Sequence, residues 1–241
     1  MALVLLLALV LMGCHHSSAP GVAPPILLFN GTGASPNDVK AVEAILKKHR
    51  LEYSTANSQQ LNAMSEAELR AYRLIIIPGG NYITIGQSLS TNTTANIRKA
   101  VQAGSNYLGI CAGGFLAGDA PSNSLNLTSG VRFDFYAALQ RGVRKEAVLI
   151  ASAGTPPVEH YWEDGPQFGG WGAVVGQYPD GTPAIVEGPS GKGWVVLCGV
   201  HPEAPDNWRH GMTFTQPARI ANAYAGTLVE AALNARSLTH H

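Results

Sequence analysis

Short apolar runs alternate with amphipathic segments along the first half of the chain. Residues 25–30 (PILLFN) and 74–78 (LIIIP) are uninterrupted apolar runs bounded by turn residues, a pattern that is typical of buried parallel strands. Between them, Ser35 and Pro36 form a helix-start signal, and the apolar positions that follow, to about residue 50, share one helical face. Because strands and helices alternate, the pattern predicts βαβ units and a parallel sheet with helices on both faces.

The same pattern predicts further elements along the chain. In the first half these are two strands over residues 51–54 and 106–110 and two helices that start near residues 65 and 93. From about residue 125 to 187, aromatic residues, glycines and short alternating runs predict antiparallel hairpins, with a turn at Asp180-Gly181. Residues 193–200 then return to a buried strand, and residues 217–236 form an amphipathic closing helix. One α/β domain over residues 26–241, with an antiparallel excursion, fits this order better than two domains.

Composition and charge exclude two classes of protein. Apolar residues make up 46% of the 241 residues and charged residues 13%, which favours a packed core over a disordered chain. Lys plus Arg and Asp plus Glu are balanced at 16 each, so the formal net charge is zero, and no basic run is present. The chain therefore lacks the electrostatic footprint of a nucleic-acid-binding protein.

The N-terminal residues have a composition of their own. Residues 2–13 (ALVLLLALVLMG) are a continuous apolar run, which suits a signal-peptide core and is too short to span a bilayer unaided. Residues 11–14 (LMGC) resemble a bacterial lipobox, in which Cys14 is lipidated; cleavage without lipidation and a buried N-terminal helix are the alternatives. We expect residues 1–25 to be a signal segment and tether, and the protein to be an exported bacterial protein, periplasmic or anchored as a lipoprotein.

The two remaining cysteines, Cys111 and Cys198, lie in different apolar segments. This arrangement does not indicate a disulfide framework, and no Cys/His spacing indicates a zinc site. Cys198 lies within the apolar run at residues 193–200 and is predicted to be a small core residue. The sequence therefore predicts no metal site and no cofactor.

Cys111 lies where an apolar strand meets small residues, within residues 107–115 (YLGICAGGF). Small neighbours permit a tight, strained turn that lifts one side chain clear of the sheet, as in a nucleophile elbow. The helix that follows directs its positive N-terminal end at Cys111, which favours thiolate over thiol. The N–H of Ala112 is free at that helix start and can donate to a developing oxyanion. We therefore predict that Cys111 is a catalytic nucleophile.

Other candidate site residues follow core strands that end at the same sheet edge. Gly80 follows one of them, and its N–H is a candidate second oxyanion donor, with a plain turn as the alternative. His201 follows the last core strand and can take the thiol proton and return it to a leaving group. Glu203 can orient the imidazole and stabilise its charged form. His160 and His210 remain alternatives for the base.

Three short segments together resemble a known superfamily. Residues 109–114 (GICAGG), 78–80 (PGG) and 201–203 (HPE) resemble the class I glutamine amidotransferase-like superfamily. Within it, residues 97–117 are most similar to the biotin-protein ligase N-terminal domain family. The resemblance implies a flavodoxin-like α/β fold. It also implies a catalytic triad of Cys111, His201 and Glu203.

The chain departs from two relatives of that superfamily. Glutamine amidotransferases usually carry a larger residue and then a His-Gln pair that help hold glutamine, where this chain has residues 112–115 (AGGF). The related intracellular protease and chaperone branch uses an acidic residue from the early sheet edge beside its cysteine, and residues 79–81 (GGN) offer none. The resemblance thus implies acyl-transfer chemistry without assigning glutamine as the substrate.

These inferences favour a thiol-dependent amidase or hydrolase that acts on a small-molecule amide or a peptide-like substrate. Residues 159–171 (EHYWEDGPQFGGW) form either its specificity wall or a packed aromatic hairpin. The alternative function is a catalytically silent ligand-binding or scaffold protein that retains the fold. No nucleic-acid partner is expected, the membrane is a partner only through the N-terminal anchor, and the sequence assigns no oligomeric state.

Overall fold

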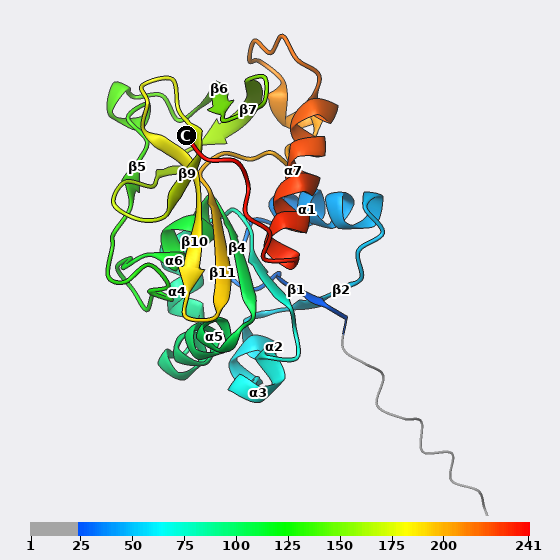
Figure 1. The fold of residues 1–241 in the computed structure, drawn as a ribbon, viewed down its shortest axis with the longest axis vertical. Coiled ribbons are helices and arrows are strands. Elements are labelled where there is room, and N and C mark those ends of the chain that lie inside the picture. Colours follow the sequence, from blue (N-terminus) through cyan, green and yellow to red (C-terminus); the bar gives the residue numbers. More distant parts are fainter. Residues whose placement is uncertain (1–23) are drawn as a thin grey trace, which may run out of the picture.

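A nine-stranded mixed sheet organises residues 24–241, which are the residues that the computed structural model describes (Figure 1). The strands, including the two of a separate small sheet, are β1 (Ile26–Phe29), β2 (Tyr53–Ala56), β3 (Leu74–Ile77), β4 (Asn106–Ile110), β5 (Asp134–Phe135), β6 (Lys145–Ser152), β7 (Val158–Glu163), β8 (Pro166–Gln167), β9 (Ala173–Gln177), β10 (Pro183–Ser190) and β11 (Gly193–Cys198). The large sheet has the order β2-β1-β3-β4-β11-β10-β9-β6-β7, and β5 pairs with β8. Cys14 and the predicted signal segment lie outside the described residues.

The large sheet has a parallel half and an antiparallel half. Strands β2, β1, β3, β4 and β11 run parallel to one another. The pairings from β11 through β10, β9 and β6 to β7 are antiparallel. The predicted α/β architecture, a parallel sheet with an antiparallel excursion, is therefore confirmed, and β9 and β10 enclose the predicted turn at Asp180-Gly181.

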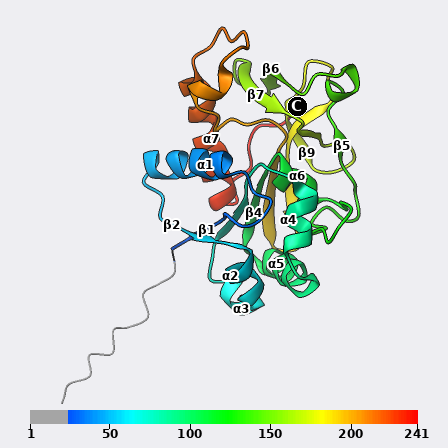
Figure 2. The same ribbon diagram turned by 180° about the vertical axis from the view of Figure 1, so that it is seen from behind.

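Helices cover both faces of the parallel half (Figure 1 and Figure 2). They are α1 (Pro36–Lys48), α2 (Ser58–Ala63), α3 (Glu66–Leu69), α4 (Tyr82–Ser88), α5 (Thr91–Ala103), α6 (Ala112–Ala117) and α7 (Ala218–Leu233). Helices α1 and α7 contribute to one hydrophobic core, and α2 to α6 contribute to the other. Among the described residues, no helix combines the length and the apolar character that a membrane span requires.

The parallel strands are apolar throughout because both of their faces are covered. Every residue of β1 and β3 is buried. Successive residues alternate between the two cores, so that Leu28 and Ile76 face α1 and α7, whereas Leu27 and Ile75 face the other helices. Each such side chain contributes about 1.5–3 kcal/mol through removal from water.

Several predicted elements differ from the structure in detail. Helix α4 was not predicted; its start is stabilised by Asn81, whose side chain accepts a hydrogen bond from the Thr84 N–H at 2.9 Å. The helix predicted from residue 65 is preceded by α2, and each of these two short helices begins with its own capping box. Residues 131–136 contribute only the two-residue strand β5, because β8, with which it pairs, is equally short.

The topology gathers the predicted site residues at one edge of the sheet. Strand β4 lies between β3 and β11, and all three run in the same direction. The chain therefore leaves the same edge at Gly80, Cys111 and His201. Cys111 occupies the middle position of the three, at the carboxyl edge of the strands, which is the edge where ligands bind in open α/β sheets.

A first prediction concerns the close contact of α6 with β3. A Cβ atom on Gly113 would lie 2.0 Å from the carbonyl oxygen of Ile77, in the backbone of the neighbouring strand. We expect Gly113→Ala to lower the free energy of unfolding by about 1–3 kcal/mol, because α6 has to move away from the sheet. Urea denaturation measures this change.

The matched control is Gly169→Ala. A Cβ on Gly169 would meet only the side-chain oxygen of Gln167, at 3.5 Å, which is an ordinary contact. We expect this variant to stay within about 0.5 kcal/mol of the natural chain. Equal midpoints for the Gly113 and Gly169 variants would show that the close approach of α6 to β3 does not constrain the fold.

Candidate active site

Cys111 occupies a strained turn between β4 and α6. Its φ of 49° and ψ of −103° place a non-glycine residue in a sparsely populated region of the backbone map. The Cys111 N–H donates to the carbonyl oxygen of Cys198 at 2.8 Å, and the Cys111 carbonyl accepts from the Gly114 N–H at 2.9 Å. These bonds hold the turn on both sides of Cys111. The backbone thus has the form of a nucleophile elbow.

Glycines make this elbow sterically feasible. A Cβ on Gly109 would lie 2.5 Å from the carbonyl oxygen of Gly113, and a Cβ on Gly113 would meet β3. The hydroxyl of Tyr107 donates to the same Gly113 carbonyl at 2.7 Å. Small residues on both sides of Cys111 therefore have the role that the sequence pattern indicates: they let strand and helix approach each other closely.

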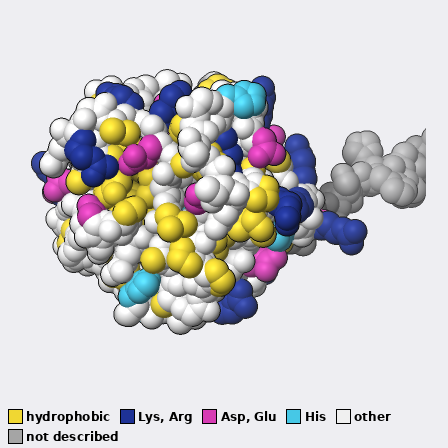
Figure 3. All heavy atoms as spheres, turned by 90° about the horizontal axis from the view of Figure 1, so that it is seen from above, with side chains coloured by type: hydrophobic (Ala, Val, Ile, Leu, Met, Phe, Trp, Pro, Cys, Tyr) yellow, Lys and Arg dark blue, Asp and Glu magenta, His cyan; other side chains and the backbone are white. Residues whose placement is uncertain are grey.

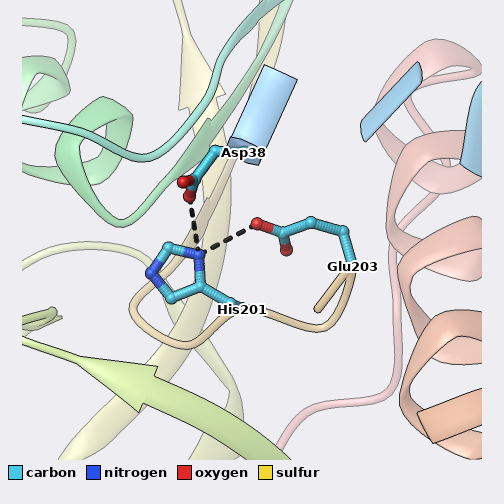
Figure 4. Close-up of side chains that lie close together, drawn as sticks. All are labelled: Asp38, His201 and Glu203. Atoms are coloured by element: carbon cyan, nitrogen blue, oxygen red, sulfur yellow. Dashed lines mark hydrogen bonds and ion pairs between the residues drawn. The ribbon is translucent and has the colours of Figure 1, made fainter. Parts of the chain in front are cut away.

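His201 lies between two buried carboxylates (Figure 4). Its Nδ1 is 2.9 Å from Oε1 of Glu203 and 3.1 Å from Oδ1 of Asp38. All three side chains are at least nine-tenths buried. Because Nδ1 carries at most one hydrogen, it donates to one carboxylate at a time, and Nε2 is the ring nitrogen that remains for proton exchange.

Asp38 is the site residue that the sequence analysis did not identify, because an acid in the first turn of a helix is a common helix-start feature. Its carboxylate reaches the sheet edge from the first turn of α1, directly after β1. Gly79 leaves the room for this contact, because a Cβ there would lie 2.0 Å from Oδ1 of Asp38 and 2.7 Å from Cε1 of His201. An acid thus does reach the early sheet edge, although residues 79–81 supply none. The position of Asp38 in the first turn of the helix that follows a core strand is the signal that could have identified it.

The charges of this cluster stabilise one another. Burial disfavours the imidazolium, but Cys111, Glu203 and Asp38 together outweigh it and raise the pKa of His201 well above its usual range. Burial also acts against the carboxylate of Asp38, yet the charge of His201 holds the pKa of Asp38 below its usual value. For Glu203, burial prevails and raises the pKa of the carboxyl group. The charged pair of His201 and Asp38 is therefore the favoured state.

One cluster among the described residues has the donor types of a metal site, and it is this same trio. One donor atom from each of Asp38, His201 and Glu203 lies within 4.8 Å of the others. Two of these contacts run through the Nδ1 of His201, so a metal ion bound there would displace the proton that joins the imidazole to its carboxylates. Ion pairing accounts for the cluster on its own.

A cavity of about 530 Å³ brings the candidate residues together. Cys111, His201, Gly80 and Ala112 all line it. Ala112 is the first residue of α6, so its N–H has no acceptor within the helix. Gly80 has a φ of 145°, and a Cβ there would lie 2.2 Å from the carbonyl oxygen of Gly33. Glycine is therefore required at this turn, and both predicted oxyanion donors border the same space as the thiol.

One wall of the cavity is aromatic. Tyr82 stacks on Phe115 with ring centroids 4.6 Å apart, and Phe115 contacts Phe135 at 4.7 Å. Ile83 and Leu139 extend this apolar surface. The wall combines residues of α4, α6 and β5. Of these three elements, β5 lies in the segment from about residue 125 to 187 that was predicted to form antiparallel hairpins.

The opposite wall is polar and comes from the end of β7. The carbonyl oxygen of Glu163 lies 3.7 Å from Sγ of Cys111 and accepts a hydrogen bond from the thiol. Arg144 and Asp164 form an ion pair at the same cavity. The block predicted as either a specificity wall or an aromatic hairpin is in part both, because Trp162 and Phe168 are buried in the core whereas Glu163 and Asp164 line the cavity.

The other histidines within residues 24–241, and Cys198, do not line this cavity. His160 is buried against Tyr224, with ring centroids 5.5 Å apart, and burial lowers its pKa to about 3. His210 is exposed and does not line the cavity. Cys198 is fully buried, as predicted, and burial raises the pKa of its thiol. Among the described residues, His201 is therefore the one histidine that lines the cavity together with Cys111.

Comparisons with known proteins agree with this architecture. Residues 25–143 match the family model described as biotin-protein ligase, N terminal. The biotin–protein ligase of Schizosaccharomyces pombe is 24% identical over 213 residues, which cover 74% of this chain and 33% of that protein. The chain thus spans about a third of the length of this curated relative.

Solved structures share the fold at low sequence identity. A glutamine amidotransferase matches with a TM-score of 0.61 and 20% identity, over 86% of this chain and 99% of its own. A second glutamine amidotransferase, from Thermotoga maritima, has a TM-score of 0.55 and 12% identity, over 86% and 97%. An exo-β-1,4-mannosidase from an Opitutaceae bacterium matches with a TM-score of 0.56 and 16% identity, over 88% of this chain and 36% of that enzyme. Residues 25–143 thus resemble the biotin-protein ligase N-terminal family, and the described chain has a glutamine amidotransferase-like fold.

Proposed function

We propose that this protein is a thiol-dependent amidase or hydrolase in which Cys111, His201 and Glu203 carry out acyl transfer. The observation that carries the proposal is the location of a strained cysteine and a doubly carboxylate-paired histidine on one cavity. Nucleophile, base and orienting acid are the parts that acyl transfer through a covalent intermediate requires.

The reaction would proceed in two steps. In the first, His201 takes the proton of the Cys111 thiol, the sulfur attacks the carbonyl carbon of an amide, and the C–N bond breaks as His201 passes this proton to the departing amine. The product is a thioester on Cys111. In the second step, His201 takes a proton from water and the water oxygen attacks the thioester carbon. The C–S bond then breaks to release a carboxylic acid, and His201 returns the proton to the sulfur, which regenerates the thiol.

Two backbone donors would stabilise the negative oxygen that forms in both steps. They are the N–H groups of Gly80 and Ala112, two residues that line the cavity together with Cys111. Backbone donors that are already held in place do not reorganise as charge develops, which is why they are effective in such sites. The positive φ of Gly80 presents its peptide to the cavity in a conformation that residues other than glycine rarely adopt.

Glu203 and Asp38 would divide the task of holding His201. Glu203, the more deeply buried of the two, is the nearer partner of Nδ1, at 2.9 Å. Asp38 lines the cavity and supplies a second negative charge at 3.1 Å. Together they keep the imidazole oriented and favour its charged form, which is the form that donates a proton to the leaving amine.

A second candidate function is ligand binding without turnover on the same cavity. The observation that favours it is the environment of Cys111, whose side chain is almost fully buried and donates to the Glu163 carbonyl. A thiol held in this way is less available for attack. Cys111→Ser separates the two functions, since a binding protein would retain its biological effect in that variant.

We also propose that the protein is exported and that Cys14 anchors it in the membrane through a lipid. The apolar run at residues 2–13 and the following cysteine are the basis of this proposal. In a bacterial host, Cys14→Ala is expected to move the protein from the membrane fraction to a soluble or unprocessed form, as fractionation and mass spectrometry would show. Cys198→Ala serves as the control, and an unchanged distribution of the Cys14 variant would contradict lipid anchoring.

A further prediction concerns the reactivity of the two described cysteines. Near neutral pH, we expect iodoacetamide to alkylate Cys111 selectively over Cys198. Removal of the base in His201→Ala is expected to slow this labelling by about 10-fold or more, because the thiolate loses its counter-charge. Peptide mass mapping against time measures both rates.

The control variant for this labelling is His210→Ala, which removes an exposed histidine outside the cavity. It is expected to label at the natural rate. A Cys111 that reacts no faster than Cys198, or that is indifferent to the loss of His201, would exclude the proposed triad. Release of amine from amide and peptide libraries, with Cys111→Ala as the blank, then identifies substrates.

The contribution of Asp38 leads to a prediction about pH. We expect Asp38→Asn to lower the pKa of His201, because the neutral amide no longer stabilises the imidazolium. Nitrogen-detected NMR titration of His201 measures the change. Glu43→Gln is the control, since it removes a carboxylate from the same helix outside the cavity. An unchanged titration of His201 would mean that Asp38 does not act on it.

The same pair predicts how stability depends on pH. The folded-state pKa of His201 is raised, so its contribution is complete below the unfolded value of about 6.5 and is lost as pH rises through the folded pKa. The folded-state pKa of Asp38 is lowered, so its contribution is present above about 3.9 and is lost as pH falls through the folded pKa. The stability difference between the natural chain and Asp38→Asn is therefore expected to be largest between about pH 4 and 6.5 in urea denaturation.

A further inference from the structure

Glu163 lies at the border of the proposed nucleophile. It is the last residue of β7, its side chain is exposed, and it lines the cavity. The distance of 3.7 Å between its carbonyl oxygen and Sγ of Cys111 places the residue beside the reacting atom. If the carbonyl group of a substrate were bound at Cys111, the substituents attached next to that carbonyl would lie close to Glu163.

The carboxylate of Glu163 is held in a defined position. The hydroxyl of Tyr161 donates to Oε2 of Glu163 at 2.5 Å. The Tyr161 ring itself contacts two other rings, with centroid distances of 5.8 Å to His201 and 5.6 Å to Trp208. Burial, followed by the hydrogen bond and charge of Glu163, raises the pKa of Tyr161, so the phenol remains a donor. An exposed side chain with such support is preorganised for binding.

The cavity leaves this carboxylate without a cationic partner. Arg144 is the one Lys or Arg among the cavity-lining residues, and it pairs with Asp164. Within residues 24–241, no ion pair includes Glu163. Asp164 adds a further acceptor, because its Oδ1 is buried and has no hydrogen-bond partner in the described part of the chain. The polar wall therefore offers acceptors for a group that has several donors and a positive charge.

Charge outside the cavity does not provide the same selectivity. The face seen in Figure 3 carries apolar, basic and acidic side chains interspersed with one another. The formal net charge of the whole chain is zero. A ligand is therefore selected by the groups that line the cavity, and not by a field of one sign over this face.

The aromatic wall supplies the complementary surface. Tyr82, Phe115 and Phe135 face the same cavity as Glu163, with Cys111 among the residues that line it. In an amide of an amino acid, the ammonium group and the side chain are both attached to the carbon next to the scissile carbonyl. A carboxylate wall and an aromatic wall around one nucleophile match these two substituents.

We propose that the substrate of this site is an aminoacyl amide or a peptide N-terminus. Its free α-ammonium would bind the Glu163 carboxylate and its apolar side chain would pack against Tyr82, Phe115 and Phe135. Glu163 is then a substrate-binding residue that selects a free amino terminus, and Tyr161 is a positioning residue that acts through Glu163. The inference rests on the proposed function and names the substrate class for the same nucleophile.

The test compares two reagents that differ only at the amino group. Phenylalanine chloromethyl ketone carries the free ammonium, and its N-acetyl derivative does not. In each case the Cys111 thiolate attacks the methylene carbon, a C–S bond forms and chloride leaves, so labelling is measured without turnover. We expect the natural chain to react about 10-fold or more faster with the free-amine reagent, the preference given by a charge-assisted hydrogen bond.

The variants assign this preference to a residue. Glu163→Gln is expected to reduce the ratio of the two labelling rates to about one, and Tyr161→Phe to reduce it in part, because the carboxylate loses its fixed position. Glu146→Gln, which removes a carboxylate from the neighbouring strand β6 outside the cavity, is the matched control and should keep the ratio.

The outcomes separate this inference from the proposed function. Equal rates for both reagents in the natural chain, with Cys111 labelled and His201 required, would overturn the amino-terminus inference and leave the hydrolase proposal in place. A Cys111 that neither reagent labels would overturn both. Retention of the preference in Glu163→Gln would also overturn the inference, because the amine would then be bound by another group.

Discussion

The strained backbone at Cys111 is the constraint on which the rest of the site depends. A non-glycine residue at a φ of 49° persists only where its surroundings hold it. Here the Cys111 N–H donates to β11, and α6 packs so closely on β3 that Gly113 has no room for a side chain. The strands on both sides of β4 thus hold the turn in place. The position of the sulfur is therefore determined by the parallel sheet.

The same sheet edge determines the electrostatics. His201 leaves β11 and Asp38 enters α1 after β1, so strands on opposite sides of β4 deliver an imidazole and a carboxylate to one buried place. Their separation of 3.1 Å in a setting with little water makes the attraction much stronger than on the surface. The contact also requires glycine at position 79, because the side chain of any larger residue at Gly79 would collide with both Asp38 and His201.

The parts that could be predicted from the sequence are those that depend on local pattern. Apolar runs identify β1, β3 and β4, and small residues around Cys111 identify the elbow, because one-dimensional spacing determines both. Asp38 was missed since its role depends on the neighbour that the fold brings to it, whereas its sequence context indicates only a helix start. Glu163 falls within the block at residues 159–171 that was predicted as a specificity wall or an aromatic hairpin. The sequence did not single it out, because β7 is an edge strand whose register with respect to Cys111 depends on long-range pairing.

The division of the sheet into two halves also divides the tasks of the site. The parallel half supplies Cys111, His201 and the backbone of Gly80 and Ala112, and its fold is shared with the glutamine amidotransferases that match this chain. The antiparallel half supplies Glu163 and Asp164, and the strand β5 adds Phe135 to the opposite wall. A change in the antiparallel half can therefore alter which ligand fits while the elbow and the histidine cluster keep their geometry. Since fold alone does not determine function, the walls of the cavity are where the specificity of this chain has to be sought.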